Sequence, residues 1–328
     1  MRPLLPLAGA AVLLGLSACA APTAPAPGGS AAPGASAAQT AATTPVAIAT
    51  TTQLGSILGD ITACAGATSA TLMRPGTDPH DFALASDQVA AMARAKLVVA
   101  NGLGLEGGMA SALANVKADG GRVYEVAPDV DPLAYDDLEA DHAGEAGTHT
   151  HEHGSFDPHV ALDAGRMARA AENIGKQLTA ATGEAQYTAC GVRVGAEIAQ
   201  TDAQVQQILA AIPKERRVLI TDHEAFNYFA QAYDFHVAGV VVPGGSTDAE
   251  PSSADIARIV AVVKAEGVPA IFSNVAVNPK LVEAVAREAG SVKVVPLHVD
   301  SVGEAGSGAE TYRALMIKNA EAIAAALA

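Results

Sequence analysis

The stretch Met73-Arg-Pro-Gly-Thr-Asp-Pro-His-Asp-Phe82 follows a strand-like run at residues 69–72 and precedes a helical pattern. Its two prolines and one glycine exclude regular secondary structure, so the chain must turn here and hold His80 on a stiff loop. The triplet Asp78-Pro79-His80 recurs once, as Asp157-Pro158-His159. The repeat indicates two imidazoles that are presented from stiff turns.

The composition predicts an acidic, globular protein with two domains. The chain has 328 residues, of which 50% are hydrophobic and only 17% are charged, and this is enough apolar material for two medium-sized cores. Lysine and arginine number 20 against 35 acidic residues, which gives a formal net charge of −15. Because no basic surface is available to neutralise phosphates, we expect no nucleic-acid partner. An acidic surface suits an exported protein and attracts cations.

The first 19 residues have the pattern of an export signal. Arg2 is the only charged residue before Asp60, and the apolar run at residues 4–16 is too short to span a bilayer comfortably. The run ends in Leu16-Ser-Ala-Cys19, which resembles a bacterial lipobox and predicts Cys19 as the site of lipid attachment. We therefore expect an extracytoplasmic protein anchored to the membrane through lipid. The alternative is a plain secretory signal in which Cys19 is incidental.

Residues 20–44 contain alanine, proline, glycine, serine and threonine but no charge, so they read as a flexible tether. Beyond Cys19, the mature chain retains only Cys64 and Cys190. Outside the cytoplasm these two either pair in a disulfide, which we favour, or remain separate buried thiols.

From residue 45 onward, apolar strand-like runs alternate with helical patterns, which is typical of an α/β fold. Runs such as residues 97–100 are apolar throughout, which favours mainly parallel sheets covered on both faces by helices. A helix predicted at residues 160–180 is followed by a longer one. The sequence predicts two α/β lobes, residues 45–182 and 213–328, joined by one long linking helix at residues 183–212.

Residues 129–154 interrupt this alternation with an acidic segment that ends in a histidine-rich tract. Its histidines are His142, His149, His151 and His153. Such a composition predicts a loop that attracts metal ions. The alternative is a solvated acidic loop whose histidines are incidental.

Four candidate metal ligands lie at or just past predicted strand ends, where open α/β sheets bind ligands: His80, His159, His223 and Asp300. Three imidazoles and one carboxylate would form a closed four-coordinate site suited to Zn²⁺. They are far apart in the sequence, so no local spacing motif supports them. Taken singly, each histidine can equally be a hydrogen-bonded structural residue.

Five motifs stand out along the chain: Pro75-Gly76-Thr77-Asp78-Pro79-His80-Asp81-Phe82, Leu97-Val98-Val99-Ala100-Asn101-Gly102-Leu103-Gly104-Leu105-Glu106, Asp157-Pro158-His159-Val160, Thr221-Asp222-His223-Glu224-Ala225-Phe226 and Val299-Asp300-Ser301-Val302-Gly303. Together they resemble the zinc/manganese-binding lipoproteins of bacterial ABC transporters. The resemblance implies two lobes that clamp a metal ion and deliver it to a membrane permease. It assigns His80 and His159 to the first lobe, and His223 and Asp300 to the second.

The resemblance also implies zinc as the metal. Zinc members of this family characteristically have histidine at the third ligand position and often a histidine-rich loop, whereas manganese members tend to have glutamate there. Zn²⁺ is therefore the expected cargo of a monomeric, non-enzymatic binding protein, and Mn²⁺ is the alternative. Its expected partners are the permease, the membrane through the lipid anchor, and a metallochaperone.

Three questions stay open at the level of sequence. His298 lies two residues before Asp300 on the same predicted strand face, so it either supports or replaces a ligand or is an exposed histidine at a strand end. An exported zinc-dependent hydrolase is a rival function, although neither a His-Glu-x-x-His nor a Gly-x-Ser-x-Gly motif occurs. A surface adhesin, for which metal would be incidental, is another.

Overall fold

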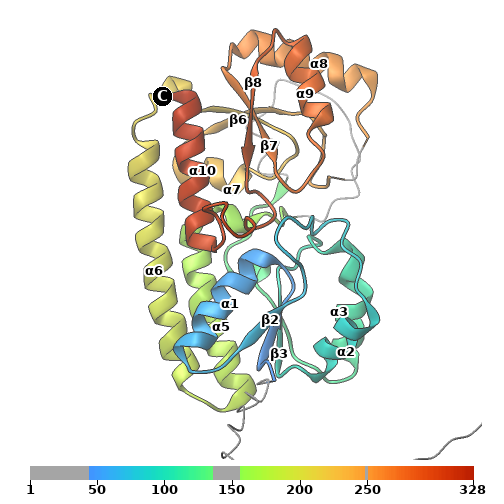
Figure 1. Ribbon diagram of the computed structural model, residues 1–328, viewed down its shortest axis with the longest axis vertical. Coiled ribbons are helices and arrows are strands. Elements are labelled where there is room, and N and C mark those ends of the chain that lie inside the picture. Colours follow the sequence, from blue (N-terminus) through green and yellow to red (C-terminus); the bar gives the residue numbers. More distant parts are fainter. Residues whose placement is uncertain (1–43, 136–155, 248–249) are drawn as a thin grey trace, which may run out of the picture. The chain divides into compact units, whose positions relative to one another are not determined.

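The computed structural model describes residues 44–135, 156–247 and 250–328 (Figure 1). The predicted signal and tether with Cys19, and the four histidines of the loop, lie outside the described residues. Strands, helices and short 3-10 turns alternate along the described chain, as the sequence predicts. No helix within the described ranges is long and apolar enough to cross a membrane.

The first lobe is built on a four-stranded parallel sheet in the order β2-β1-β3-β4. Its strands are β1 (Ala47–Ala49), β2 (Ser69–Thr71), β3 (Leu97–Ala100) and β4 (Val123–Glu125). Its helices are α1 (Thr52–Cys64), α2 (Ser86–Arg94) and α3 (Ala110–Ala118), with 3-10 turns η1 (Gly107–Met109) and η2 (Ala127–Asp129).

The second lobe repeats this plan with the order β6-β5-β7-β8, again all parallel. Its strands are β5 (Val218–Thr221), β6 (His236–Val240), β7 (Ala270–Asn274) and β8 (Lys293–Leu297). Its helices are α7 (Asn227–Tyr233), α8 (Ser253–Glu266), α9 (Lys280–Glu288) and α10 (Tyr312–Leu327), after the 3-10 turn η4 (Lys214–Arg216). In each lobe the second strand in sequence lies on one side of the first strand, and the third and fourth lie on its other side. The two lobes therefore share one topology.

Two long antiparallel helices lie between the two lobes in the sequence, and the second of them joins the lobes. Helix α5 (Ala164–Thr182) packs on the first lobe, and α6 (Gln186–Leu209) runs beside both lobes (Figure 1). Its 24 residues span about 36 Å at the α-helical rise. The predicted fold of two α/β lobes joined by one long helix is therefore confirmed.

The helix predicted at residues 160–180 is in fact two elements. A 3-10 turn, η3 (Val160–Leu162), ends at Asp163, whose side chain accepts a hydrogen bond from Arg166 N and so caps α5. An aspartate in this role starts a new helix because it satisfies an amide that has no partner within the helix. His159 lies just before η3 and outside both elements.

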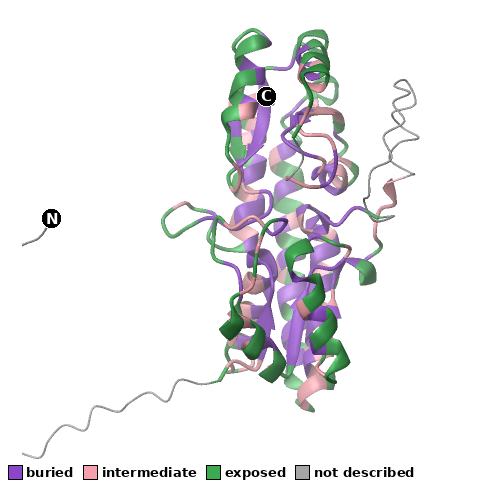
Figure 2. Cartoon of the chain, turned by 90° about the vertical axis from the view of Figure 1, so that its right-hand side faces the viewer, coloured by how far each residue is buried: buried purple, intermediate pink, exposed green. Residues whose placement is uncertain are grey.

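Strands β1, β3 and β7 are buried along their whole length because both faces of each sheet are covered there (Figure 2). In β1, Ala47 and Ala49 join the large core that includes α5, α6 and α10, whereas Ile48 points to the opposite core under α2 and α3. In β7, Phe272 likewise belongs to the large core, whereas Ile271 belongs to a core under α8 and α9. The large core contains residues of both lobes and joins them on the side of the long helices.

Helix α6 is held tightly to the first lobe. A disulfide joins Cys64 at the end of α1 to Cys190 in α6, with 5.8 Å between the Cα atoms. Gly175 of α5 faces Gly191 of α6 so closely that a Cβ added at Gly175 would lie 2.9 Å from Gly191 Cα. Only glycine permits this approach of two helix backbones, so α1, α5 and α6 form a rigid support for the metal centre.

Candidate metal centre

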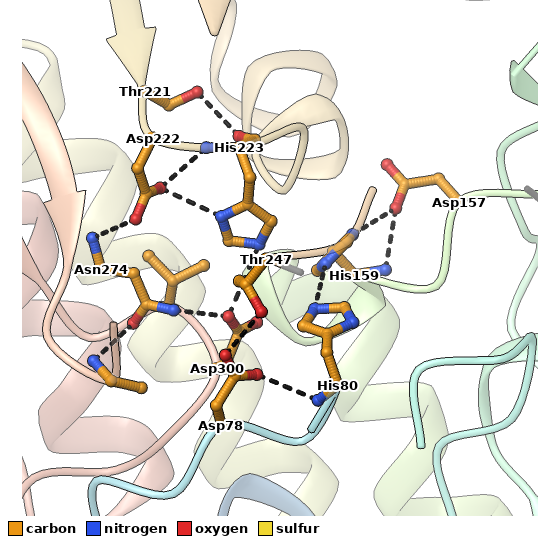
Figure 3. Close-up of polar contacts among 12 residues, drawn as sticks. Asp78, His80, Asp157, His159, Thr221, Asp222, His223, Thr247, Asn274 and Asp300 are labelled. Carbon is orange, nitrogen blue, oxygen red and sulfur yellow. Dashed lines mark hydrogen bonds and ion pairs between the residues drawn. The ribbon is translucent and has the colours of Figure 1, made fainter. Parts of the chain in front are cut away.

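Four buried side chains from both lobes meet between the sheets: His80, His159, His223 and Asp300 (Figure 3). One ligand atom from each lies within 4.8 Å of the others. His80 follows β2 and His223 follows β5, while Asp300 follows β8 and His159 lies just before η3. The structure thus brings together the four side chains that the sequence predicts as ligands.

The spacing of the ligand atoms suits a small tetrahedral ion. His159 Nε2 lies 3.3 Å from His80 Nε2, and His223 Nε2 lies 3.5 Å from Asp300 Oδ2. Ligands bound to zinc at about 2.0–2.1 Å in a tetrahedron are about 3.4 Å apart. His223 Nε2 is buried and has no hydrogen-bond partner. A buried polar nitrogen without a partner is costly unless something binds it, and a metal ion would.

Asp157 fixes the imidazole of His159. Its Oδ1 accepts hydrogen bonds from His159 N (2.9 Å) and pairs with His159 Nδ1 at 2.8 Å. Asn227 Nδ2 donates to Asp157 Oδ2 (3.0 Å), and the Tyr228 hydroxyl donates to the Asp157 carbonyl (2.6 Å). With Nδ1 bound to the carboxylate, the proton stays on Nδ1 and Nε2 is free to bind metal.

Asp222 fixes the imidazole of His223 in the second lobe. Its Oδ1 accepts from His223 N and pairs with His223 Nδ1, both at 3.0 Å, while its Oδ2 accepts from Asn274 N at 2.6 Å. The side chain of Asn274 donates to Asp300 Oδ2, so one residue at the end of β7 positions both ligands of this lobe.

The turn that carries His159 also rests on the first lobe. The Asn101 side chain donates to the Pro158 carbonyl at 2.9 Å. Glu106 is fully buried and accepts from Thr50 Oγ1 (2.6 Å) and Asn101 N (2.7 Å). Burial raises the pKa of Glu106, and these hydrogen bonds lower it in part.

Burial and neighbouring charges give His80 and His223 different affinities for protons. Burial and the imidazoles of His159 and His223 lower the pKa of His80 to about 2. Burial alone would lower the pKa of His223, but the carboxylates of Asp222 and Asp300 outweigh it and raise that pKa to about 9. Burial raises the pKa of Asp300. At neutral pH His223 therefore carries a proton that a metal ion must displace.

His298 does not lie on the face that the strand pattern predicts. Strand β8 ends at Leu297, so the two-residue alternation no longer applies to His298 and Asp300. The backbone of His298 pairs with the side chain of Asn319 in α10, by 2.9 Å and 2.7 Å hydrogen bonds. His298 is not in the ligand group, and the contacts described for it do not reach that group.

Sequence reasoning missed the residues that orient the ligands. The sequence offers a signal for Asp157 and Asp222, since an acidic residue stands one or two positions before each histidine. It offers none for Asn227 and Asn274, which lie far from their partners along the chain.

Comparison with known proteins identifies the family. A sequence model of the family ZnuA, described as "Zinc-uptake complex component A periplasmic", matches residues 48–326. The chain belongs to this family. It is a metal-binding, substrate-binding protein of ABC transporters, and family members of this kind are transport proteins, not enzymes.

Individual relatives bind different metals according to their names. The chain is 32% identical over 267 residues to zinc-binding protein TroA of Treponema pallidum, covering 78% of this chain and 80% of TroA. A solved structure of periplasmic TroA matches with a TM-score of 0.74 and 28% identity over 87% of this chain and 99% of that one. The manganese-binding lipoprotein MntA of Halalkalibacterium halodurans is 27% identical over 277 residues, covering 83% of this chain and 86% of MntA. The family thus includes both zinc and manganese binders.

Proposed function

We propose that this protein captures Zn²⁺ outside the cytoplasm and delivers it to the membrane permease of an ABC-type importer. The observation that carries the proposal is the set of three imidazole nitrogens and one carboxylate oxygen within 4.8 Å, with His223 Nε2 buried and lacking a hydrogen-bond partner. The zinc-uptake description of the family and the similarity to TroA support the same metal.

The ligand chemistry favours Zn²⁺ over Mn²⁺. Imidazole nitrogen suits zinc, whereas manganese prefers oxygen ligands, and this site offers three nitrogens against one oxygen. Four protein ligands also fill a tetrahedron, whereas a catalytic zinc keeps one position open for water. The site is therefore better suited to holding zinc as cargo than to hydrolysis.

The proposal also covers the domain organisation and the parts of the chain outside the described residues. Residues 1–19 are the lipoprotein signal, Cys19 is acylated, and residues 20–44 tether the protein to the membrane. Residues 45–182, 183–212 and 213–328 are the first lobe, the linking helix and the second lobe of a monomer. The histidine-rich tract at residues 142–153 raises the zinc concentration near the site or receives zinc from a metallochaperone.

The test is calorimetry with zinc and manganese on ligand variants. His80→Ala, His159→Ala and His223→Ala should each weaken zinc binding severely, because each removes one of four ligands. His236→Ala is the matched control, because His236 is exposed at the start of β6, the end of the strand opposite the metal centre. Wild-type zinc affinity in all three ligand variants would contradict the proposal, and tighter binding of manganese than of zinc would reassign the metal.

A further inference from the structure

The loop that carries His80, residues 74–82, is the most accessible part of the metal centre. His80 is 8% exposed, compared with 3% for His159, 1% for His223 and 5% for Asp300. Residues 74–76 of the loop are exposed, and residues 77 and 78 are half-buried. A metal ion that leaves the site is therefore most easily released past this loop.

Two hydroxyl groups of the second lobe bind this loop across the lobe boundary. Ser301 Oγ accepts a hydrogen bond from Gly76 N at 2.7 Å. Thr247 Oγ1 donates to Asp78 Oδ2 at 2.6 Å, as Figure 3 shows. Within the loop, the backbone forms one turn, in which Thr77 N donates to the Arg74 carbonyl. The contacts to the other lobe are therefore a major part of what holds the loop in place.

Each of these two hydrogen bonds involves a residue that neighbours or binds a proposed metal ligand. Asp78 uses its other oxygen, Oδ1, to accept a hydrogen bond from His80 N at 2.9 Å, so Thr247 and His80 share one carboxylate. Ser301 follows Asp300 and also contacts Thr52 Oγ1 of α1 at 3.2 Å. Ser301 thus connects the His80 loop with the segment that carries Asp300, and Thr247 connects it with the segment after β6.

We propose that Thr247 and Ser301 are positioning residues that set the rate at which the metal is released. The inference rests on the proposed function, because it takes zinc as the cargo. Zinc leaves only after a ligand separates from it, and the His80 loop moves away only when both hydrogen bonds break. Both bonds hold the His80 loop in place in the structure, so losing one should speed release far more than it changes the first encounter with zinc.

The Thr247 contact gives the cleaner test, because Thr247 is distant in sequence from every ligand. Thr247→Val keeps the shape of the side chain and removes the hydroxyl, whereas Thr247→Ser keeps the hydroxyl. A lost hydrogen bond to a carboxylate should make release about 10-fold faster in Thr247→Val. Zinc release into excess EDTA, followed by stopped flow, measures this rate. Association should stay within about twofold of wild type, and Thr247→Ser should restore slow release.

Thr201→Val is the matched control, because Thr201 donates its hydroxyl to the Glu197 carbonyl within α6, away from the metal centre. Equal release rates in wild type and Thr247→Val would overturn the inference, as would equally fast release in Thr201→Val. If Thr247→Val does not fold, Ser301→Ala carries the same prediction.

Amide hydrogen exchange in the metal-free protein separates this inference from the proposed function. Residues 74–82 should exchange faster in Thr247→Val than in Thr247→Ser, whether or not zinc is the cargo. If wild-type protein binds no zinc but the exchange difference is found, the proposed function fails and the positioning role stands. If zinc binds tightly and Thr247→Val changes neither the release rate nor the amide exchange, the positioning role is wrong and the proposed function stands.

Discussion

Zinc binding at pH 8 should release about one proton for each zinc ion bound. In the metal-free protein the pKa of His223 is raised to about 9 by Asp222 and Asp300 against the effect of burial, so His223 is about 90% protonated at pH 8. The pKa of His80 is lowered to about 2, so His80 has no proton to release. An ordinary imidazole with a pKa near 6.5 is only about 3% protonated at this pH. The raised pKa of His223 alone accounts for the proton.

Calorimetry in two buffers of different ionisation enthalpy measures this number directly. Because a ligand imidazole must be neutral, zinc affinity should rise about tenfold per pH unit between pH 7 and 8 and level off above about pH 9. Asp222→Asn removes the charge that contributes most to raising the pKa, so its proton release at pH 8 should fall well below that of wild type. Release of about 0.1 protons or fewer by wild type would refute the reasoning.

The same proton makes the stability of the metal-free protein depend on pH. The folded-state pKa of His223 is raised, so its contribution to stability is complete below about pH 6.5 and is lost as the pH rises towards 9. The shift corresponds to about 3 kcal/mol in the free energy of unfolding. Urea denaturation at a series of pH values checks this, and a zinc-loaded sample is the control, because bound zinc has already displaced the proton.

Three further results are expected. Asp157→Asn should weaken zinc binding about 10- to 100-fold in calorimetry, because the amide cannot accept from both the imidazole and Asn227; unchanged affinity would contradict this. The double variant Cys64→Ser/Cys190→Ser should lose up to about 5 kcal/mol of unfolding free energy, from a link across 126 residues, while its zinc affinity stays within about twofold of wild type. Gly191→Ala should cost about 1–3 kcal/mol in thermal or chemical unfolding, because its Cβ would lie 2.7 Å from a backbone oxygen of α5; a neutral result would show that the helices separate easily.

The two sheets, and the four side chains that the structure brings together, could be predicted from the sequence. The run at residues 97–100 is apolar throughout because its strand is covered on both faces, and this property is visible in the residues themselves. His223 and Asp300 closely follow β5 and β8, and parallel strands bring such ends to one edge of a sheet. His80 and His159 lie on loops farther from a strand, and their repeated triplet Asp-Pro-His made them visible in the sequence.

What the sequence could not predict depends on contacts between distant segments. Asp78 and Asp157 occupy identical triplets, yet only Asp157 pairs with the imidazole of the histidine that follows. Asn227 and Tyr228 of the other lobe bind Asp157 and fix it, whereas Thr247 binds Asp78. Local sequence is the same in both triplets, so the difference arises entirely from the fold.

The sequence left the position of His298 open for a related reason. A two-residue alternation predicts the face of a side chain only while the strand continues, and β8 ends one residue before His298. Where a strand ends is set by its pairing with β7, which closes with Asn274 opposite Leu297.

The central claim is that one zinc ion binds His80, His159, His223 and Asp300. The most direct measurement is anomalous diffraction from a crystal grown with equal concentrations of Zn²⁺ and Mn²⁺, collected at the absorption edges of both metals. We predict one strong zinc peak among the four side chains, about 2.0–2.2 Å from each ligand atom, and no manganese peak there. A manganese peak at this position, or a zinc peak only elsewhere in the protein, would contradict the claim.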